Sequence, residues 1–266
     1  MESKVHPLSD RRLVFLPGLD GTGISFEPFG AVLPKDIAVC VVRYPADKPL
    51  SFEETVCCAR DQIPWDEDVL VLAESFSGPV ALALIGSGLI SPECLVLCST
   101  FARSPRPRVL KALRLLPLER LLKLPAPRLL LKLVVAGGVE SADLLLGLWQ
   151  RIRVMVTPEV LAHRLKMISR VEVRAFLPGL SIPCLYLQAA SDRTIPGSAL
   201  FDFMEAVPDL RVRRIPGPHF ILQARPRESL EAIQRFAGLA WRSAGRARGK
   251  HAKKGETHGH KDQTRL

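Results

Sequence analysis

The chain has 266 residues, 47% hydrophobic and 24% charged, which is the composition of a large globular domain with a substantial buried core. No apolar stretch is long enough to span a bilayer, and the first residues lack the apolar centre of a secretory signal, so we expect a cytoplasmic protein. The six cysteines include no C-x-x-C pair of the zinc or redox type, and we expect neither metal nor cofactor.

The net charge of +10 is concentrated in two parts of the chain. Residues 101–180 contain 15 Lys and Arg against 5 Asp and Glu, and residues 242–266 contain 8 against 2. Residues 1–100 are acidic, with 7 against 14. Together with the apolar pattern described below, this division predicts a core from residues 1–100 and 181–241, a helical cap at residues 101–180, and a disordered basic tail at residues 242–266.

The first predicted strand, residues 13–16, is followed by the glycine-rich turn Pro17-Gly18-Leu19-Asp20-Gly21-Thr22-Gly23. Its glycine spacing differs from the Gly-x-Gly-x-x-Gly fingerprint, and no Gly-Lys-Ser/Thr follows, which argues against a phosphate-binding loop. Such a turn can instead aim a backbone N–H at the oxygen that becomes negative when an ester carbonyl is attacked. We assign this donor to Leu19, beside Gly18.

Helices are predicted at residues 24–33 and 52–63, the second with a capping box of Ser51 and Glu54, and strands at residues 37–42 and 69–72. The alternation of short apolar strands with helices continues through a helix at 79–85 and a strand at 95–98. It predicts an α/β fold with a mostly parallel sheet of about six strands. Ligands of such sheets bind at the carboxyl ends of the strands.

Ser75 lies at the joint between the strand at 69–72 and the apolar helix that follows. A serine on this kind of turn has the geometry of a nucleophile elbow, which requires small residues two positions away, here Ala73 and Ser77. One alternative is an ordinary helix N-cap, in which the serine accepts a backbone N–H. A second is a register with Ser77 as the nucleophile, but the helix would then start too late.

The expected cap, residues 101–180, has leucines at helical spacing, such as Leu161 and Leu165, with basic residues such as Arg164 between them. Prolines divide it into about four helices, and no strand is predicted. Its place after the fourth strand allows it to cover the elbow. We expect some of its leucines, which the sequence does not identify individually, to contact substrate, although leucine-rich helices more often pack only into a core.

The sheet resumes at residues 182–187, and Asp192 follows in a loop, where an Asp is more often a turn former or a helix cap. A helix at 201–207 and a strand at 211–215 lead to the turn that contains His219. A serine hydroxyl needs a neighbouring base, and that base needs an orienting group. Because Ser75, Asp192 and His219 each follow a strand of one parallel sheet, we expect them to meet at one edge.

In this order of nucleophile, acid and histidine, the chain resembles the α/β-hydrolase family over residues 11–240. The resemblance is carried by the elbow at 73–78, the acid loop at 191–196, the histidine turn at 217–220 and the oxyanion loop at 17–19. It implies that Ser75, Asp192 and His219 are catalytic and that the N–H groups of Leu19 and Phe76 form the oxyanion hole. Gly18, Leu19 and Phe76 are also the expected substrate contacts.

Two features differ from many family members. Pro17-Gly18 stands where His-Gly is common, and we expect no antiparallel hairpin before the first strand.

The glycine-rich loop is similar to that of a branch of the family with plant acyltransferases that form fatty-acid esters. The basic cap is similar to that of an esterase acting on a carrier-bound ester. We therefore expect a serine carboxylesterase for apolar acyl groups. The alternatives are acyl transfer to an alcohol other than water, cleavage of esters held by an acidic carrier protein, and ligand binding without turnover.

The basic cap has two interpretations. Interspersed Arg and Lys residues usually form a solvated face. The alternative is that they attract an acidic carrier protein or an anionic lipid surface. We expect a small-molecule or lipid-like ester as substrate, and no nucleic acid.

Overall fold

The computed structural model describes residue 8 and residues 11–64, 68–124 and 142–256, with side chains as far as residue 241. Its centre is an entirely parallel six-stranded sheet in the order β2-β1-β3-β4-β5-β6. The strands are β1 (Arg12–Leu16), β2 (Ala38–Val41), β3 (Val69–Glu74), β4 (Cys94–Cys98), β5 (Cys184–Ala189) and β6 (Arg211–Ile215). All six predicted strands are present, and their parallel arrangement confirms the predicted fold class.

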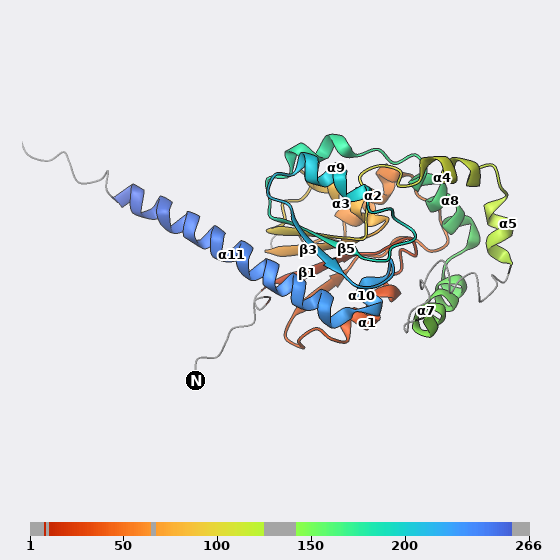
Figure 1. Cartoon of the computed structure of the whole chain (residues 1–266), viewed down its shortest axis with the longest axis horizontal. Coiled ribbons are helices and arrows are strands. Elements are labelled where there is room, and N and C mark those ends of the chain that lie inside the picture. The colour runs from red at the N-terminus through yellow and green to blue at the C-terminus, as the bar shows by residue number, and fades with distance from the viewer. Residues whose placement is uncertain (1–7, 9–10, 65–67, 125–141, 257–266) are drawn as a thin grey trace, which may run out of the picture.

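Two helical layers cover the sheet, as Figure 1 shows. One contains α2 (Phe52–Arg60), α3 (Ser77–Gly86), η2 (Arg174–Gly179) and α9 (Ala199–Ala206), and the other contains α1 (Glu27–Gly30), α10 (Ile221–Ala224) and α11 (Pro226–Glu256). Alternate residues of β3 face the two layers: Val71 and Ala73 pack with the first, and Leu70 and Leu72 with the second. Every residue of β3 and β4 is buried, which explains their continuous apolar sequences.

Local sequence signals set several helix boundaries. At the start of α2, the Ser51 hydroxyl accepts the Glu54 N–H at 3.1 Å, and the Glu54 carboxylate accepts the Ser51 N–H at 2.7 Å, so the predicted capping box is present. The single helix predicted over residues 24–33 is wrong: η1 (Ile24–Phe26) is followed by the short α1. Pro28 has no N–H to donate to Ile24, so a continuous helix cannot form there.

Between β4 and β5 the chain forms α4 (Pro107–Leu113), α5 (Leu118–Lys123), α7 (Ala142–Met155) and α8 (Pro158–Ile168). These helices lie beyond the carboxyl ends of the strands (Figure 1). Pro107 and Pro158 each stand in the first turn of a helix, where the missing N–H is not needed. We refer to residues 101–180 as the cap segment, although its last helix, η2, packs in the first layer over the sheet. Residues 125–141 of this segment lie outside the described residues.

Helix α11 continues past residue 241, where the predicted core ends. It continues to Glu256, so the prediction that a disordered tail begins at residue 242 is wrong for residues 242–256, while 257–266 lie outside the described residues. This stretch contains the helix formers Ala, Arg and Lys and no proline, although its three glycines lower its helix propensity. Its last turns project away from the sheet (Figure 1).

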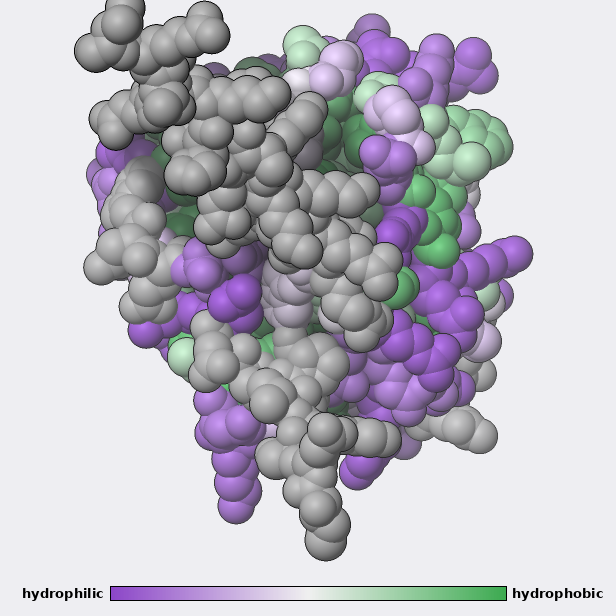
Figure 2. Space-filling model, turned by 90° about the vertical axis from the view of Figure 1, so that its left-hand side faces the viewer, coloured by the Kyte–Doolittle hydropathy of each residue, from purple (hydrophilic) through white to green (hydrophobic). Residues whose placement is uncertain are grey.

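Figure 2 shows the molecule from the side on which α11 projects: hydrophilic residues stand at the edges of this face, with hydrophobic residues visible between them. Within the ranges listed above, no helix has the combination of length and apolar composition that would let it cross a membrane.

A chain that ends at Ser243 should unfold within about 2 °C of the full-length protein, because the last turns of α11 project from the core. Differential scanning calorimetry measures this. The control Phe236→Ala removes a side chain of α11 that is 3% exposed, and should cost about 3–5 kcal/mol. A fall of more than about 5 °C on truncation would show that the projecting part contributes to stability.

Candidate active site

Ser75 occupies a sharp turn between β3 and α3, as predicted. Its φ of 50° lies in the left-handed region, which is unfavourable for a residue with a Cβ atom. The Ser75 N–H donates to Cys98 O at 2.9 Å, which continues the β3–β4 pairing into the turn. The strained turn places the hydroxyl at the carboxyl edge of the sheet, where the residue is 9% exposed.

The structure brings Ser75, His219 and Asp192 together in one chain of hydrogen bonds. The distance from Ser75 Oγ to His219 Nε2 is 2.9 Å, and from His219 Nδ1 to Asp192 Oδ2 it is 2.8 Å. With the Nδ1–H tautomer that a carboxylate favours, His219 donates to Asp192 and accepts from Ser75. The arrangement can therefore take a proton from the serine hydroxyl.

Asp192 is held in place by its own loop. Its Oδ1 accepts the backbone N–H groups of Thr194 and Ile195, both at 2.8 Å, which leaves Oδ2 for His219. The Ser191 N–H donates to Gly217 O at 2.9 Å and joins the acid loop to the histidine turn. Burial lowers the pKa of His219, but the charge of Asp192, their hydrogen bond and the charge of Glu74 outweigh it, so the pKa is raised above its ordinary value.

Thr100 fixes the orientation of the Phe76 N–H. Its hydroxyl donates to Ser75 O at 2.5 Å, and the Gly78 N–H donates to the same oxygen at 3.1 Å. In a planar trans peptide the C=O and N–H point in opposite directions. The hydrogen bonds to the Ser75 carbonyl therefore fix the Phe76 N–H in the direction opposite to that carbonyl. Gly78 is required here, because a Cβ atom would lie 1.9 Å from the Thr100 hydroxyl.

The Leu19 N–H is fixed in the same manner. Gly18 O accepts the Gly21 N–H at 3.1 Å, which orients the peptide unit whose N–H belongs to Leu19. The Ser77 hydroxyl donates to Pro17 O and accepts from the Tyr44 hydroxyl at 2.8 Å. Ser77 is thus more than a small residue beside the elbow, because it ties the start of α3 to the glycine-rich turn.

A cavity of about 410 Å³ lies between this edge of the sheet and the cap segment. Gly18, Leu19, Ser75 and His219 line its base. The cap contributes mostly apolar side chains: Phe101, Val109, Leu110, Leu113, Trp149, Ile152, Leu165 and Ile168. Phe76 packs in the main core at 1% exposed, so its side chain is not among the lining residues. Three leucines of the cap segment, Leu110, Leu113 and Leu165, line this cavity.

Glu74 places an unexpected carboxyl group beside Ser75. It is 1% exposed, lines the cavity, and accepts a hydrogen bond from Gln223 Nε2 on α10 at 3.0 Å. Burial raises the pKa of Glu74 to about 7, against the opposing effects of the Gln223 bond and of His219. A buried carboxyl group with a strongly raised pKa therefore lies next to the serine.

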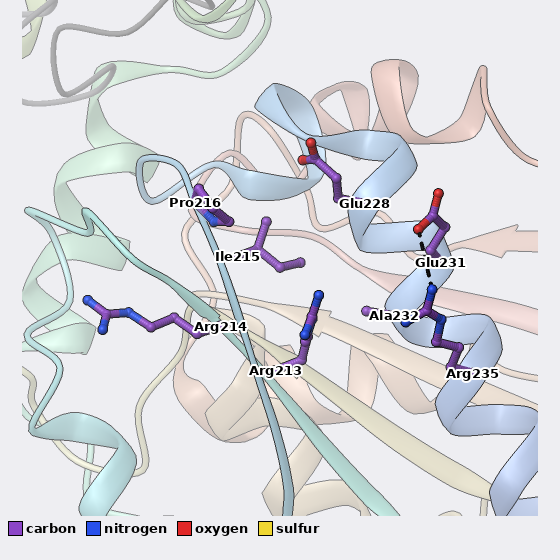
Figure 3. A pocket seen from close by; sticks show the side chains of 8 residues that line it. All are labelled: Arg213, Arg214, Ile215, Pro216, Glu228, Glu231, Ala232 and Arg235. Atoms are coloured by element: carbon purple, nitrogen blue, oxygen red, sulfur yellow. Dashed lines mark ion pairs between the residues drawn. The ribbon is translucent and has the colours of Figure 1, made fainter.

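A second hollow, of about 260 Å³, lies between β6 and α11 and is lined largely by charged side chains. Figure 3 shows Arg235 paired with Glu231 on α11, at 4.0 Å, near Arg213 of β6. None of its lining residues belongs to the candidate site. Over the described part of the chain, no group of three or more His, Cys, Asp and Glu side chains has the arrangement of a metal site.

Sequence reasoning did not identify several residues that shape this site. Thr100, Gln223 and the buried Arg164 act through contacts between segments far apart in the chain. The pair Ser77-Gly78 was a partial signal for Thr100, since a glycine at the start of a helix indicates close approach by another group. Glu74 was visible beside the serine, but its burial depends on α10.

Comparison with known proteins agrees with the fold. No family model matches the sequence. Phytyl ester synthase 1, chloroplastic, of Arabidopsis thaliana is 26% identical over 162 residues, which cover 58% of this chain and 22% of that protein. The chain thus aligns with about a fifth of the length of this curated relative.

Solved structures match most of the chain. The enol-lactonase from Burkholderia xenovorans LB400 is 18% identical with a TM-score of 0.66, covering 86% of this chain and 91% of that one. MenH from S. aureus is 17% identical with a TM-score of 0.67, covering 91% and 97%. The esterase EaEST from Exiguobacterium antarcticum is 13% identical with a TM-score of 0.68, covering 86% and 92%. The protein has the α/β-hydrolase fold.

Replacing Glu74 with Gln should shift the acid limb of the kcat/KM–pH curve to lower pH. The negative charge of Glu74 stabilises protonated His219, so its removal lowers the pKa of the histidine, and the neutral base persists in more acidic solution. Glu205→Gln, which removes an exposed charge on α9, is the control and should leave the curve unchanged. An unchanged curve for Glu74→Gln, or a shift to higher pH, would contradict this coupling.

Proposed function

We propose that the protein is a serine hydrolase that cleaves carboxylic esters with an apolar acyl group through an acyl-enzyme intermediate. The observation that carries the proposal is the hydrogen-bonded chain from Ser75 through His219 to Asp192 at the base of a largely apolar cavity. Ester-acting proteins among the similar structures support it as well.

In the first step, His219 Nε2 takes the Ser75 proton as Oγ attacks the ester carbonyl carbon. The carbonyl oxygen becomes an oxyanion, to which the N–H groups of Leu19 and Phe76 donate. Protonated His219 then gives its proton to the leaving alkoxide, which departs as the alcohol and leaves the acyl group on Ser75.

In the second step, His219 takes a proton from water as the water oxygen attacks the acyl carbon. His219 then returns the proton to Ser75 Oγ as the bond between this oxygen and the acyl carbon breaks, which releases the carboxylic acid and restores the serine. The Asp192 carboxylate orients His219 and stabilises the imidazolium. An oxyanion donor contributes about 2.7–4 kcal/mol in a serine enzyme, so the two backbone donors account for a large part of the expected rate.

Acyl transfer to an alcohol other than water is the second candidate function. It is favoured by the match to a protein named as an ester synthase, which reaches 26% identity over part of this chain. The chemistry differs only in the second step, where the alcohol replaces water as the attacking group. An apolar cavity of this size can admit an apolar alcohol.

For the partner, we propose that exposed basic residues of the cap segment attract an acyl substrate presented by an acidic carrier protein or by an anionic lipid surface. Arg108, Lys111 and Arg120 are exposed on α4 and α5, near the exposed apolar side chains of Val109 and Leu115. Charge of one sign around an apolar patch favours such association at low salt.

A fluorophosphonate probe should label the wild-type protein at Ser75 and leave Ser75→Ala unlabelled, as read by intact mass and peptide mapping. The reason is that the probe traps an activated serine hydroxyl. Ser77→Ala, which tests the alternative register of the elbow, should still be labelled. An unlabelled wild type, or equal labelling of Ser75→Ala, would remove the serine hydrolase proposal.

A series of p-nitrophenyl esters from acetyl to palmitoyl should give kcat/KM values that rise with chain length until the cavity is filled, by at most about fourfold per methylene.

Adding a long-chain alcohol to this assay distinguishes hydrolysis from acyl transfer, because acyl transfer yields a new ester at the expense of the acid. For carrier-bound esters, KM should rise with salt if the basic cap attracts the carrier. No dependence on chain length would contradict an apolar acyl site, and a salt-independent KM would contradict the carrier.

A further inference from the structure

Arg164 of α8 is buried, although its place among basic residues predicted a solvated side chain. It is 5% exposed, and its guanidinium donates to three backbone carbonyl oxygens. Nη1 bonds Leu19 O at 3.0 Å and Asp20 O at 2.6 Å, and Nη2 bonds Pro45 O at 2.8 Å. A cap-segment side chain therefore contacts the turn that carries the Leu19 N–H.

The surroundings of Arg164 fit a planar cation closely. Its guanidinium carbon lies 5.7 Å from the centre of the Tyr44 ring, and the Tyr44 N–H donates to Gly21 O at 2.7 Å. Gly21 has a φ of 70°, and a Cβ atom there would lie 2.4 Å from Nη1 of the arginine. The glycine is thus required both by the turn and by the space that the guanidinium fills.

The contacts of Arg164 restrict the peptide units on one side of the Leu19 donor. The carbonyls of Leu19 and Asp20 point toward the arginine, while the carbonyl of Gly18 is held by Gly21 within the turn. Without the guanidinium, two buried carbonyls would lose their partners, and such groups are costly to leave unbonded. The turn would then rearrange, and the Leu19 N–H would move with it.

A second arginine of the cap segment contacts the other loop of the site. Arg106 Nε donates to Thr194 O at 3.1 Å, and its Nη2 donates to Arg193 O at 3.0 Å, just after Asp192. Arg106 is exposed, whereas Arg164 is buried, so water can replace the bonds of the first more readily. Arg164 is the stronger connection between cap and site.

We infer that Arg164 is a positioning residue that holds the Leu19 N–H in line with the developing oxyanion. The packing of α8 on the core is therefore part of forming the oxyanion hole. This inference rests on the proposed function for its catalytic consequence, whereas the holding of the turn can be measured without any substrate. The competing explanation is that Arg164 only fastens the cap segment to the core.

Arg151 supplies the matched control for that explanation. It joins α7 of the cap segment to Glu27 of α1 through bonds of 2.6 and 2.9 Å, and neither residue belongs to the glycine-rich turn or the acid loop. Arg151→Met thus removes another connection between cap and core, a solvent-exposed ion pair, without touching the loops that carry Leu19 or Asp192.

The test compares wild type, Arg164→Met, Arg164→Lys and Arg151→Met with a short-chain p-nitrophenyl ester. For Arg164→Met we expect kcat to fall at least about 10-fold with KM changed less than about 3-fold, because the lost interaction acts in the transition state. Arg164→Lys should be intermediate, since an ammonium can reach some of the carbonyls. Arg151→Met should keep kcat within about 3-fold of wild type.

Amide hydrogen exchange of the peptide that covers residues 17–22 provides the second readout, and should be faster in Arg164→Met but not in Arg151→Met. Folded Arg164→Met with wild-type kcat, or with unchanged exchange, would overturn the inference. Should Arg164→Met not fold, Arg164→Lys must show both effects. If the wild type has no Ser75-dependent turnover, the proposed function fails, and the exchange alone decides whether Arg164 holds the turn.

Discussion

Hydrogen bonds to two carbonyls fix the orientation of the peptide units that carry the Phe76 and Leu19 N–H groups, and the proposed chemistry depends on this constraint. Ser75 O is held by Thr100 and Gly18 O by Gly21, so Phe76 and Leu19 are left as donors. The left-handed conformation at the serine costs about 1–3 kcal/mol and persists because such bonds surround it. Preorganised donors of this kind need no rearrangement when charge develops, which is the main requirement for stabilising an oxyanion.

The cap segment is rich both in apolar side chains and in arginines, and the two kinds of residue have different roles. Its apolar side chains close the cavity, which lowers the local dielectric and strengthens the interactions of the serine, histidine and aspartate beneath. Several of its arginines are bonded to the protein itself: Arg106 and Arg164 to loop carbonyls, and Arg151 to Glu27. The positive charge of this segment is thus partly structural, and only the remaining exposed basic residues are available to a partner.

Much of this arrangement could be predicted, because it follows from local patterns. The continuous apolar strands identify a parallel sheet, and the residues that come after β3, β5 and β6 must lie at one edge; this places Ser75, Asp192 and His219 near one another. Sequence patterns do not predict features of the structure that depend on a long-range contact or on a single residue. Pro183, which lacks an N–H, delays β5 to Cys184, and the bonds of Arg164 and Thr100 depend on packing between distant segments.

The central claim is that Ser75 carries an acyl group during turnover. Rapid-quench mass spectrometry of the wild-type protein mixed with an excess of an activated ester measures this directly. An acyl mass on the peptide that contains Ser75, formed within the first turnover and lost at the steady-state rate once the ester is removed, is the predicted result. Turnover without any adduct, or an adduct on another residue such as the exposed Cys57, would contradict the claim.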